Sequence, residues 1–274
     1  MVARRFRLSG THLLLLVLVV VSLYPAWFML QTALKTGTDY TLNPTGLPSH
    51  LTLENFRQAL FDLPIPRWAL NSAIVAASSV AISTVIALLA AYAIVFGAIR
   101  GRELFLRVNL ALMVVPPVVL LTPMFIFMVQ IGLINTLWSV IIFYTGLNVP
   151  FGVFFFTNFF RQFPGELIEA ATVDGSNPLT TLRRIVLPIS AAAVFTLVIV
   201  NAIWVWNELL IALVFLQDEN QRTLMSGLTL FQGRYVTNEP LIMAGAFLSI
   251  LPVLLVYLAG QRFFVRGLTA GIGK

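Results

Sequence analysis

Residues 137–160 read LWSVIIFYTGLNVPFGVFFFTNFF and contain no Asp, Glu, Lys or Arg. A run of about 20 predominantly apolar residues is long enough to cross the hydrocarbon layer of a membrane as a helix. The rest of the chain is similar, because 59% of its 274 residues are hydrophobic and only 10% are charged. A soluble protein of this size needs more polar surface than that. The composition therefore predicts an all-α polytopic membrane protein.

Hydropathy, divided by charged and turn-forming residues, predicts six transmembrane helices in a single domain over residues 1–274. The six lie at about 13–34, 69–96, 104–130, 137–160, 189–216 and 241–261. Prolines occur inside two of them, at positions 116, 117 and 123 in the third and at position 150 in the fourth. A proline removes a backbone hydrogen bond, so kinks are expected there, either as gating hinges or as static bends.

The distribution of basic residues predicts the orientation of these helices. With the N-terminus inside, 12 of the 17 lysines and arginines fall on the cytoplasmic side. The five outside are Lys35, Arg57, Arg67, Arg222 and Arg234. Cytoplasmic loops of membrane proteins carry the excess of Lys and Arg, so both termini are expected in the cytoplasm. This placement accounts for the net charge of +6, and no nucleic-acid partner is expected.

The inside loop over residues 161–188 has the signals of two short helices joined by a glycine turn. Pro164 suits the first turn of a helix, and Gly175 suits the left-handed position that follows the last turn. Ser176 or Asn177 then caps a second helix, which is expected to end at Pro188. The first helix places four residues on one face: Leu167, Ala170, Ala171 and Asp174. By composition alone, the loop also fits an amphipathic hairpin lying on the membrane surface.

The spacing of residues in this loop resembles the signature of the membrane subunits of bacterial ABC importers. The matching residues are Glu169-Ala170-Ala171, Asp174-Gly175, Ile185, Leu187 and Pro188. The resemblance implies the type I ABC importer permease fold, with 161–188 as the coupling hairpin that enters a cleft of an ATP-binding subunit. The docking residues implied are Glu169, Ala170, Ala171, Asp174 and Gly175. Arg183 and Arg184 either pair with acids of the ATPase or only follow the positive-inside rule.

Two further segments resemble carbohydrate importers of the maltose-permease type, and in particular their smaller permease subunit. They are Trp206-Asn207-Glu208 and the tail 261–271, QRFFVRGLTAG. The resemblance implies a bacterial cytoplasmic-membrane complex with a second permease, two ATP-binding subunits and an extracytoplasmic sugar-binding protein. No Walker-type phosphate loop occurs in the sequence, so ATP and Mg²⁺ are expected on the partner ATPases and no cofactor on this chain.

A few polar and aromatic residues within the predicted helices are candidates for the transport pathway. Glu208 is the only acid inside a predicted helix, and such groups are by default functional candidates. Asn201, Trp204 and Glu208 share a helix face at spacings of three and seven residues. Sugars bind aromatic faces and amides, which adds Tyr144, Asn148 and Asn207. The competing interpretations are an interfacial acid for Glu208 and lipid-facing or packing roles for the aromatic residues.

Two other function classes agree less well with the sequence. A self-sufficient secondary transporter or channel commonly has several intramembrane ionisable groups or inverted repeats, whereas here the predicted helices contain one acid, Glu208, and no repeat is visible. An intramembrane metalloprotease needs paired histidines on one helix, whereas His12 and His50 are far apart and the chain has no cysteine. Both classes also leave the cytoplasmic hairpin without a role.

Overall fold

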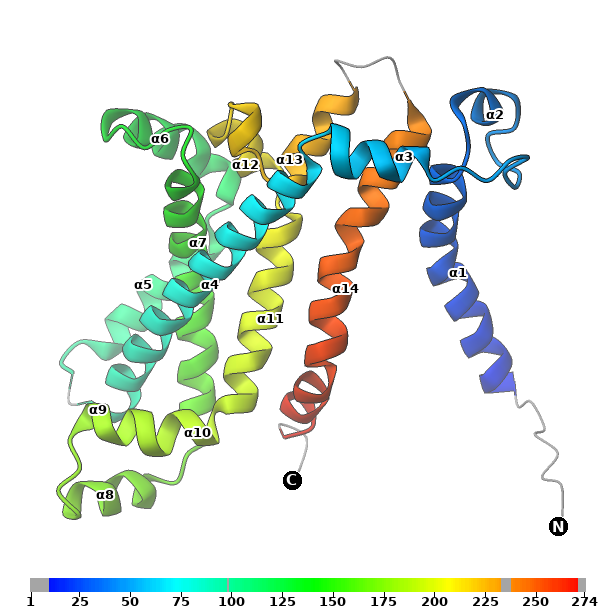
Figure 1. The fold of residues 1–274 in the computed structure, drawn as a ribbon. Helices are drawn as coiled ribbons and strands as arrows, with labels where there is room; N and C mark the ends of the chain where they lie inside the picture. The colour runs from blue at the N-terminus through cyan, green and yellow to red at the C-terminus, as the bar shows by residue number, and fades with distance from the viewer. Residues whose placement is uncertain (1–9, 98, 233–237, 271–274) are drawn as a thin grey trace, which may run out of the picture. The chain divides into compact units, whose positions relative to one another are not determined.

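The computed structural model describes residues 10–97, 99–232 and 238–270, and it is helical without strands over these ranges (Figure 1). The described residues divide into two units. One contains the described part of 1–66 together with 238–251 and residues 228–232, and the other contains 67–227 and 252–270. The all-α prediction is therefore confirmed for the described part of the chain.

The first unit contains a long apolar helix and a compact outer loop. Its helices are α1 (Gly10–Ala33), α2 (Gly37–Leu42), α3 (Glu54–Arg57), the π-helix η1 (Gln58–Asp62), the 3₁₀ helix η4 (Thr229–Gln232) and the first part of α14 (Glu239–Ala270). The end of α1 is fixed by Lys35, which is fully buried and donates through Nζ to the carbonyl oxygens of Asn43 at 2.7 Å and Pro44 at 3.3 Å. The Asn55 amide donates to the carbonyl oxygen of Lys35 at 2.7 Å. Because a buried ammonium is costly without hydrogen bonds, these contacts organise the loop around Lys35.

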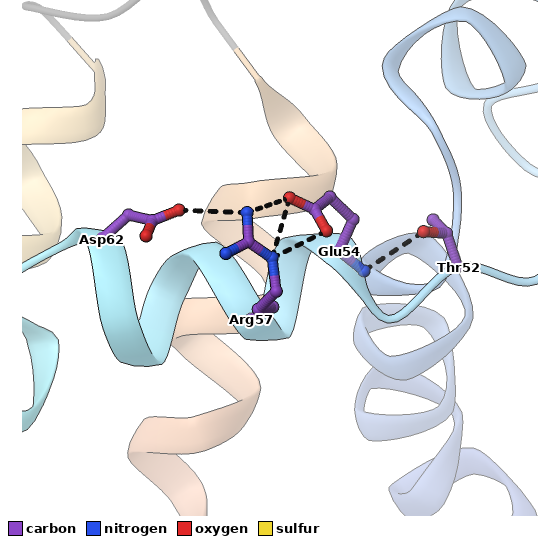
Figure 2. Close-up of polar contacts among 4 residues, drawn as sticks. All are labelled: Thr52, Glu54, Arg57 and Asp62. Atoms are coloured by element: carbon purple, nitrogen blue, oxygen red, sulfur yellow. Dashed lines mark hydrogen bonds and ion pairs between the residues drawn. The ribbon is translucent and has the colours of Figure 1, made fainter.

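An exposed cluster of charges follows this loop (Figure 2). The Thr52 hydroxyl accepts from the backbone N–H of Glu54 at 3.1 Å, at the start of α3. Arg57 then pairs with Glu54 at 2.6 Å and with Asp62 at 3.4 Å. The hydrogen bond from Arg57 holds the pKa of Glu54 below its usual value. Exposed pairs of this kind contribute little to stability, so the cluster mainly orders the short turns α3 and η1.

The second unit is a helical bundle with two apolar cores. Its helices are α4 (Ile65–Phe96, from Arg67), α5 (Arg102–Val114), α6 (Pro117–Gln130), α7 (Leu137–Phe160), α8 (Gly165–Val173), α9 (Pro178–Thr181), the π-helix η2 (Leu182–Val186), α10 (Leu187–Ile189), α11 (Ala191–Asn207), α12 (Leu210–Phe215), the 3₁₀ turn η3 (Glu219–Gln221) and α13 (Leu224–Leu228). One core surrounds Tyr144 and Phe215, and the other surrounds Phe156 and Phe160. At Gly152 a Cβ atom would lie 2.7 Å from Ala87 Cβ, so the glycine permits the close approach of α7 and α4.

Four helices are long and apolar enough to cross a membrane singly: α1, α4, α7 and residues 239–258 of α14. Two bent pairs raise the number to six if each pair is one span. The pair α5 and α6 is bent by 96°. The bend lies at Val115 and Pro116, where both residues have extended backbones. Proline restricts the residue before it to such conformations, so the expected kink in 104–130 is a sharp break.

The expected helix 189–216 is also interrupted, and its continuity was predicted wrongly. Helix α11 ends at Asn207, Glu208 has an extended backbone, and α12 begins at Leu210. The second bent pair joins residues 178–189 to α11 at an angle of 78°. Pro188 does not end the preceding helix, because α10 continues through it to Ile189.

Candidate functional site

The first helix of the hairpin over 161–188 ends in a turn that needs glycine. Gly175 has a φ of +76°, a conformation that residues with a Cβ adopt at a cost. The backbone N–H of Ser176 donates to the Ala171 carbonyl at 2.9 Å, and the N–H of Gly175 donates to Thr172 at 3.0 Å. These two bonds are those of a Schellman motif, which satisfies the last carbonyls of α8. The left-handed glycine turn predicted from the sequence is present.

The second helix of the hairpin is capped by Asn177, whose Oδ1 accepts from the Thr180 N–H at 2.8 Å. One face of this helix is buried, with Thr181 at 3% exposure and Val186 at 0%. Leu182 and Val186 belong to the same core as Phe156 and Phe160 of α7. The hairpin is therefore anchored to the transmembrane bundle through its second helix.

The hairpin exposes most of the residues expected to dock a partner, with one exception. Glu169, Ala170, Asp174 and Gly175 are exposed. Ala171 is only 5% exposed, so its side chain packs within this chain. The helical spacing predicts the shared face correctly, but the edge of that face at Ala171 is covered. Of these two alanines, only Ala170 is open to contact with another molecule.

Arg183 and Arg184 lie on the exposed side of the π-helix η2. Together with Leu179 and Thr180 they line an open groove of about 400 Å³. Within the described ranges, no ion pair joins either arginine to an acid of this chain. Both guanidinium groups are thus available to a partner, and positive-inside placement agrees with the same geometry.

Glu208 and Tyr144 meet at the break between α11 and α12. The Tyr144 hydroxyl, fully buried, donates to Glu208 Oε2 at 2.5 Å. The same carboxylate accepts from the backbone N–H of Ile211 at 3.0 Å and of Ala212 at 3.3 Å. An acid at a helix N-terminus satisfies the N–H groups that have no partner within the helix. Glu208 therefore ends one helix, begins the next, and ties both to α7.

The other pathway candidates have different surroundings. The ring of Trp204 packs edge-on against Tyr144, with centroids 5.8 Å apart. Asn207 is exposed, and its amide donates to the Ile203 carbonyl at 2.8 Å. Asn148 and Asn201 are 7% and 4% exposed, and neither side-chain nitrogen has a hydrogen-bond partner. The structure thus brings Tyr144, Trp204 and Glu208 together but leaves Asn207 outside this cluster.

A polar connection at the start of α4 was not predicted from the sequence. Asn71 donates through its amide to the carbonyl oxygens of Asn220 and Arg222, both at 2.9 Å. The Ser72 hydroxyl accepts from the Leu224 N–H at 2.8 Å. Adjacent polar residues near the start of an otherwise apolar helix are the signal for such a contact. Their role is to hold the loop that follows α12.

Residues 83–270 match the family described as the inner membrane component of binding-protein-dependent transport systems. The chain belongs to this family. The family consists of transport subunits, which agrees with the ABC permease fold, a multi-pass membrane location and partnership with other subunits. The assignment favours the importer interpretation over a self-sufficient transporter or a hydrolase.

Curated relatives extend over nearly the whole chain. The sulfoquinovosyl glycerol transport system permease protein of Agrobacterium fabrum is 36% identical, over 93% of this chain and 90% of the relative. The trehalose/maltose transport system permease protein of Thermococcus litoralis is 34% identical, over 94% of each. Among solved structures, a bacterial ABC transporter that imports the polysaccharide alginate matches with a TM-score of 0.81 at 23% identity, over 96% of this chain and 99% of that one. This last likeness establishes the fold.

By the family resemblance, the tail 261–271 either reaches toward the ATPases or serves as a basic anchor. Helix α14 continues to Ala270, whereas Gly271 and the side chains of 261–270 lie outside the described part. The contact therefore stays a prediction from the resemblance.

Proposed function

We propose that this chain is a transmembrane subunit of an ATP-driven carbohydrate importer. The proposal is supported by relatives named for the transport of sugars or sugar derivatives. These are sulfoquinovosyl glycerol, trehalose and maltose, and, at 29% identity over 91% of this chain, melibiose, raffinose and stachyose. The subunit works with a second permease, two ATP-binding subunits and an extracytoplasmic sugar-binding protein. The complex lies in a bacterial cytoplasmic membrane, with both termini of this chain in the cytoplasm.

The hairpin α8–α9 is the element that couples this subunit to ATP hydrolysis. The observation that carries this proposal is a helix with an exposed face, containing Glu169, Ala170 and Asp174, on a turn fixed by Gly175. A small residue such as Ala170 lets a partner backbone approach closely. Because the second helix is anchored in the Phe156 core, a displacement of α8 by the ATPase moves the bundle. ATP and Mg²⁺ act on the partner subunits, and this chain binds no cofactor.

Arg183 and Arg184 supplement this contact by pairing with acidic side chains of the ATPase. The transported sugar passes along α7 and α11, where Trp204 and Asn207 are exposed and Tyr144, Asn148 and Asn201 are buried. Glu208 contributes by holding the α11–α12 junction in place, since both of its oxygens already accept hydrogen bonds within the chain.

The test is co-purification of an ATP-binding subunit with the tagged chain from native membranes. Ala170→Glu adds a bulky charge on the exposed docking face and is expected to abolish recovery of the ATPase. Gln162→Glu adds the same charge to an exposed site before α8 and is expected to retain the ATPase. Ala171 is unsuitable for this test, because a buried glutamate disturbs folding itself. Recovery of no ATPase with the wild type, or equal recovery with both variants, contradicts the proposal.

A further inference from the structure

Two contacts fix the register of α7 against α11. The Tyr144 ring packs on Trp204. Two turns further along α7, a Cβ atom at Gly152 would lie 3.4 Å from Cδ2 of Leu197. The two helices therefore run antiparallel, and the two contacts are separated by about two helical turns along each helix.

Asn148 and Asn201 lie midway between these two contacts. Asn148 is four residues from both Tyr144 and Gly152, and Asn201 is four residues after Leu197 and three before Trp204. Residues at spacings of three and four lie on the same helix face. The two asparagines thus face the α7–α11 interface at the same level.

Both asparagines are buried, and their amide N–H donors are unused among the described residues. Their side chains are 7% and 4% exposed, and the amide nitrogens of both lack an acceptor. The two amides therefore do not bond to one another, because such a bond would satisfy one of the nitrogens. Buried donors without partners are costly, and proteins commonly satisfy them with a bound molecule. Two such donors at one level of a helix interface indicate a shared ligand.

We propose that Asn148 and Asn201 together bind one hydroxyl group between α7 and α11, with both amides donating to its oxygen. The hydroxyl belongs either to a bound water molecule or to the transported carbohydrate, and the second source rests on the function proposed above. A hydroxyl oxygen accepts two hydrogen bonds, which matches the two unused donors. The fully buried Tyr144, one turn away, closes one side of the site.

A thermal double-mutant cycle tests whether the two amides share a ligand. The variants are Asn148→Leu, Asn201→Leu and the double change, in the complex assembled with its partner subunits in lipid nanodiscs, with trehalose and raffinose present. Each single change releases the hydroxyl and leaves one amide unpaired, so each is expected to lower Tm by about 2–4 °C. The double change removes both amides, so its Tm is expected to return toward that of the wild type. Additive shifts, or no shift in either single variant, overturn the proposal.

A control and an uptake assay separate the two sources of the hydroxyl. Asn158→Leu changes an exposed asparagine of the same helix, whose amide donates to Phe154 at 2.9 Å, and its shift is expected to add to that of Asn201→Leu. Uptake of radiolabelled trehalose and raffinose is then measured in proteoliposomes. A severalfold higher KM in both single variants assigns the hydroxyl to the sugar, whereas unchanged uptake with a non-additive Tm cycle assigns it to water. If the wild type takes up neither sugar, the carbohydrate function fails for these substrates, while the Tm cycle still decides whether a ligand is shared.

Discussion

The contact between Tyr144 and Glu208 gives a quantitative prediction. Hydrogen bonds to charged groups each stabilise by about 1.5–3 kcal/mol, and here one carboxylate accepts from the Tyr144 hydroxyl at 2.5 Å and from the Ile211 N–H at 3.0 Å. Glu208→Gln keeps one acceptor oxygen but removes the charge and turns an NH₂ group toward N–H donors. We expect it to lower the unfolding free energy by about 2–4 kcal/mol, the sum of one lost bond and one weakened bond.

Tyr144→Phe removes only the hydroxyl, so the carboxylate still holds the start of α12. The expected loss is about 1.5–3 kcal/mol. The double variant is expected to lose about 1–2 kcal/mol less than the sum of the single variants, because both changes remove the same bond. The measurement is unfolding by dodecyl sulfate in mixed micelles, followed by tryptophan fluorescence. Tyr257→Phe is the control, since that tyrosine is 46% exposed, and its effect should be within about 0.5 kcal/mol of zero.

Additivity of Tyr144→Phe and Glu208→Gln would refute the reasoning, because it would mean that the two groups do not share a hydrogen bond. A Glu208→Gln variant as stable as the wild type would also refute it, since the start of α12 would then not depend on the charge.

Three further predictions concern the turn, the bundle and the outer loop. Gly175→Val forces a β-branched residue to a φ of +76°, so ATP hydrolysis by the purified complex should uncouple from sugar uptake while membrane insertion stays normal. Coupled uptake at the wild-type rate would exclude the docking role. Gly152→Leu adds side-chain atoms at a site where even an added Cβ would lie 2.7 Å from Ala87 Cβ. Such overpacking should lower the unfolding free energy by about 1–3 kcal/mol in the dodecyl sulfate assay, and an unchanged midpoint would show that α4 and α7 do not approach closely. Lys35→Met removes the hydrogen bonds to Asn43 and Pro44, so thermolysin should cleave the loop after α1 faster in right-side-out membranes. An unchanged cleavage rate would mean that Lys35 does not order this loop.

Local signals predict much of this fold. Uncharged runs give the long helices, and the range 137–160 coincides with α7. The hairpin is equally local, because Gly175 and Asn177 act on residues within one or two turns of themselves. Such features depend on backbone conformation and capping alone, so a single sequence suffices to predict them.

Features that depend on distant residues were not predictable in the same way. Helical spacing identifies the face shared by Ala170 and Ala171, but only the packing of the chain shows that Ala171 is covered. Hydropathy averages over a window and so joins 189–216 into one helix, although α11 ends at Asn207. The partner that makes this break stable, Tyr144, lies 64 residues earlier in the chain.

The acid and the helix break at this junction account for each other. An ionisable group at membrane depth needs partners, and an unbroken helix through Glu208 would leave it with Tyr144 alone. The break exposes the N–H groups of Ile211 and Ala212, which supply the remaining hydrogen bonds. Conversely, those N–H groups would be unsatisfied within an apolar bundle if the acid were absent. Glu208 is therefore a positioning residue, and the groups left to bind a hydroxyl are the amides of Asn148 and Asn201, whose nitrogens have no partner among the described residues.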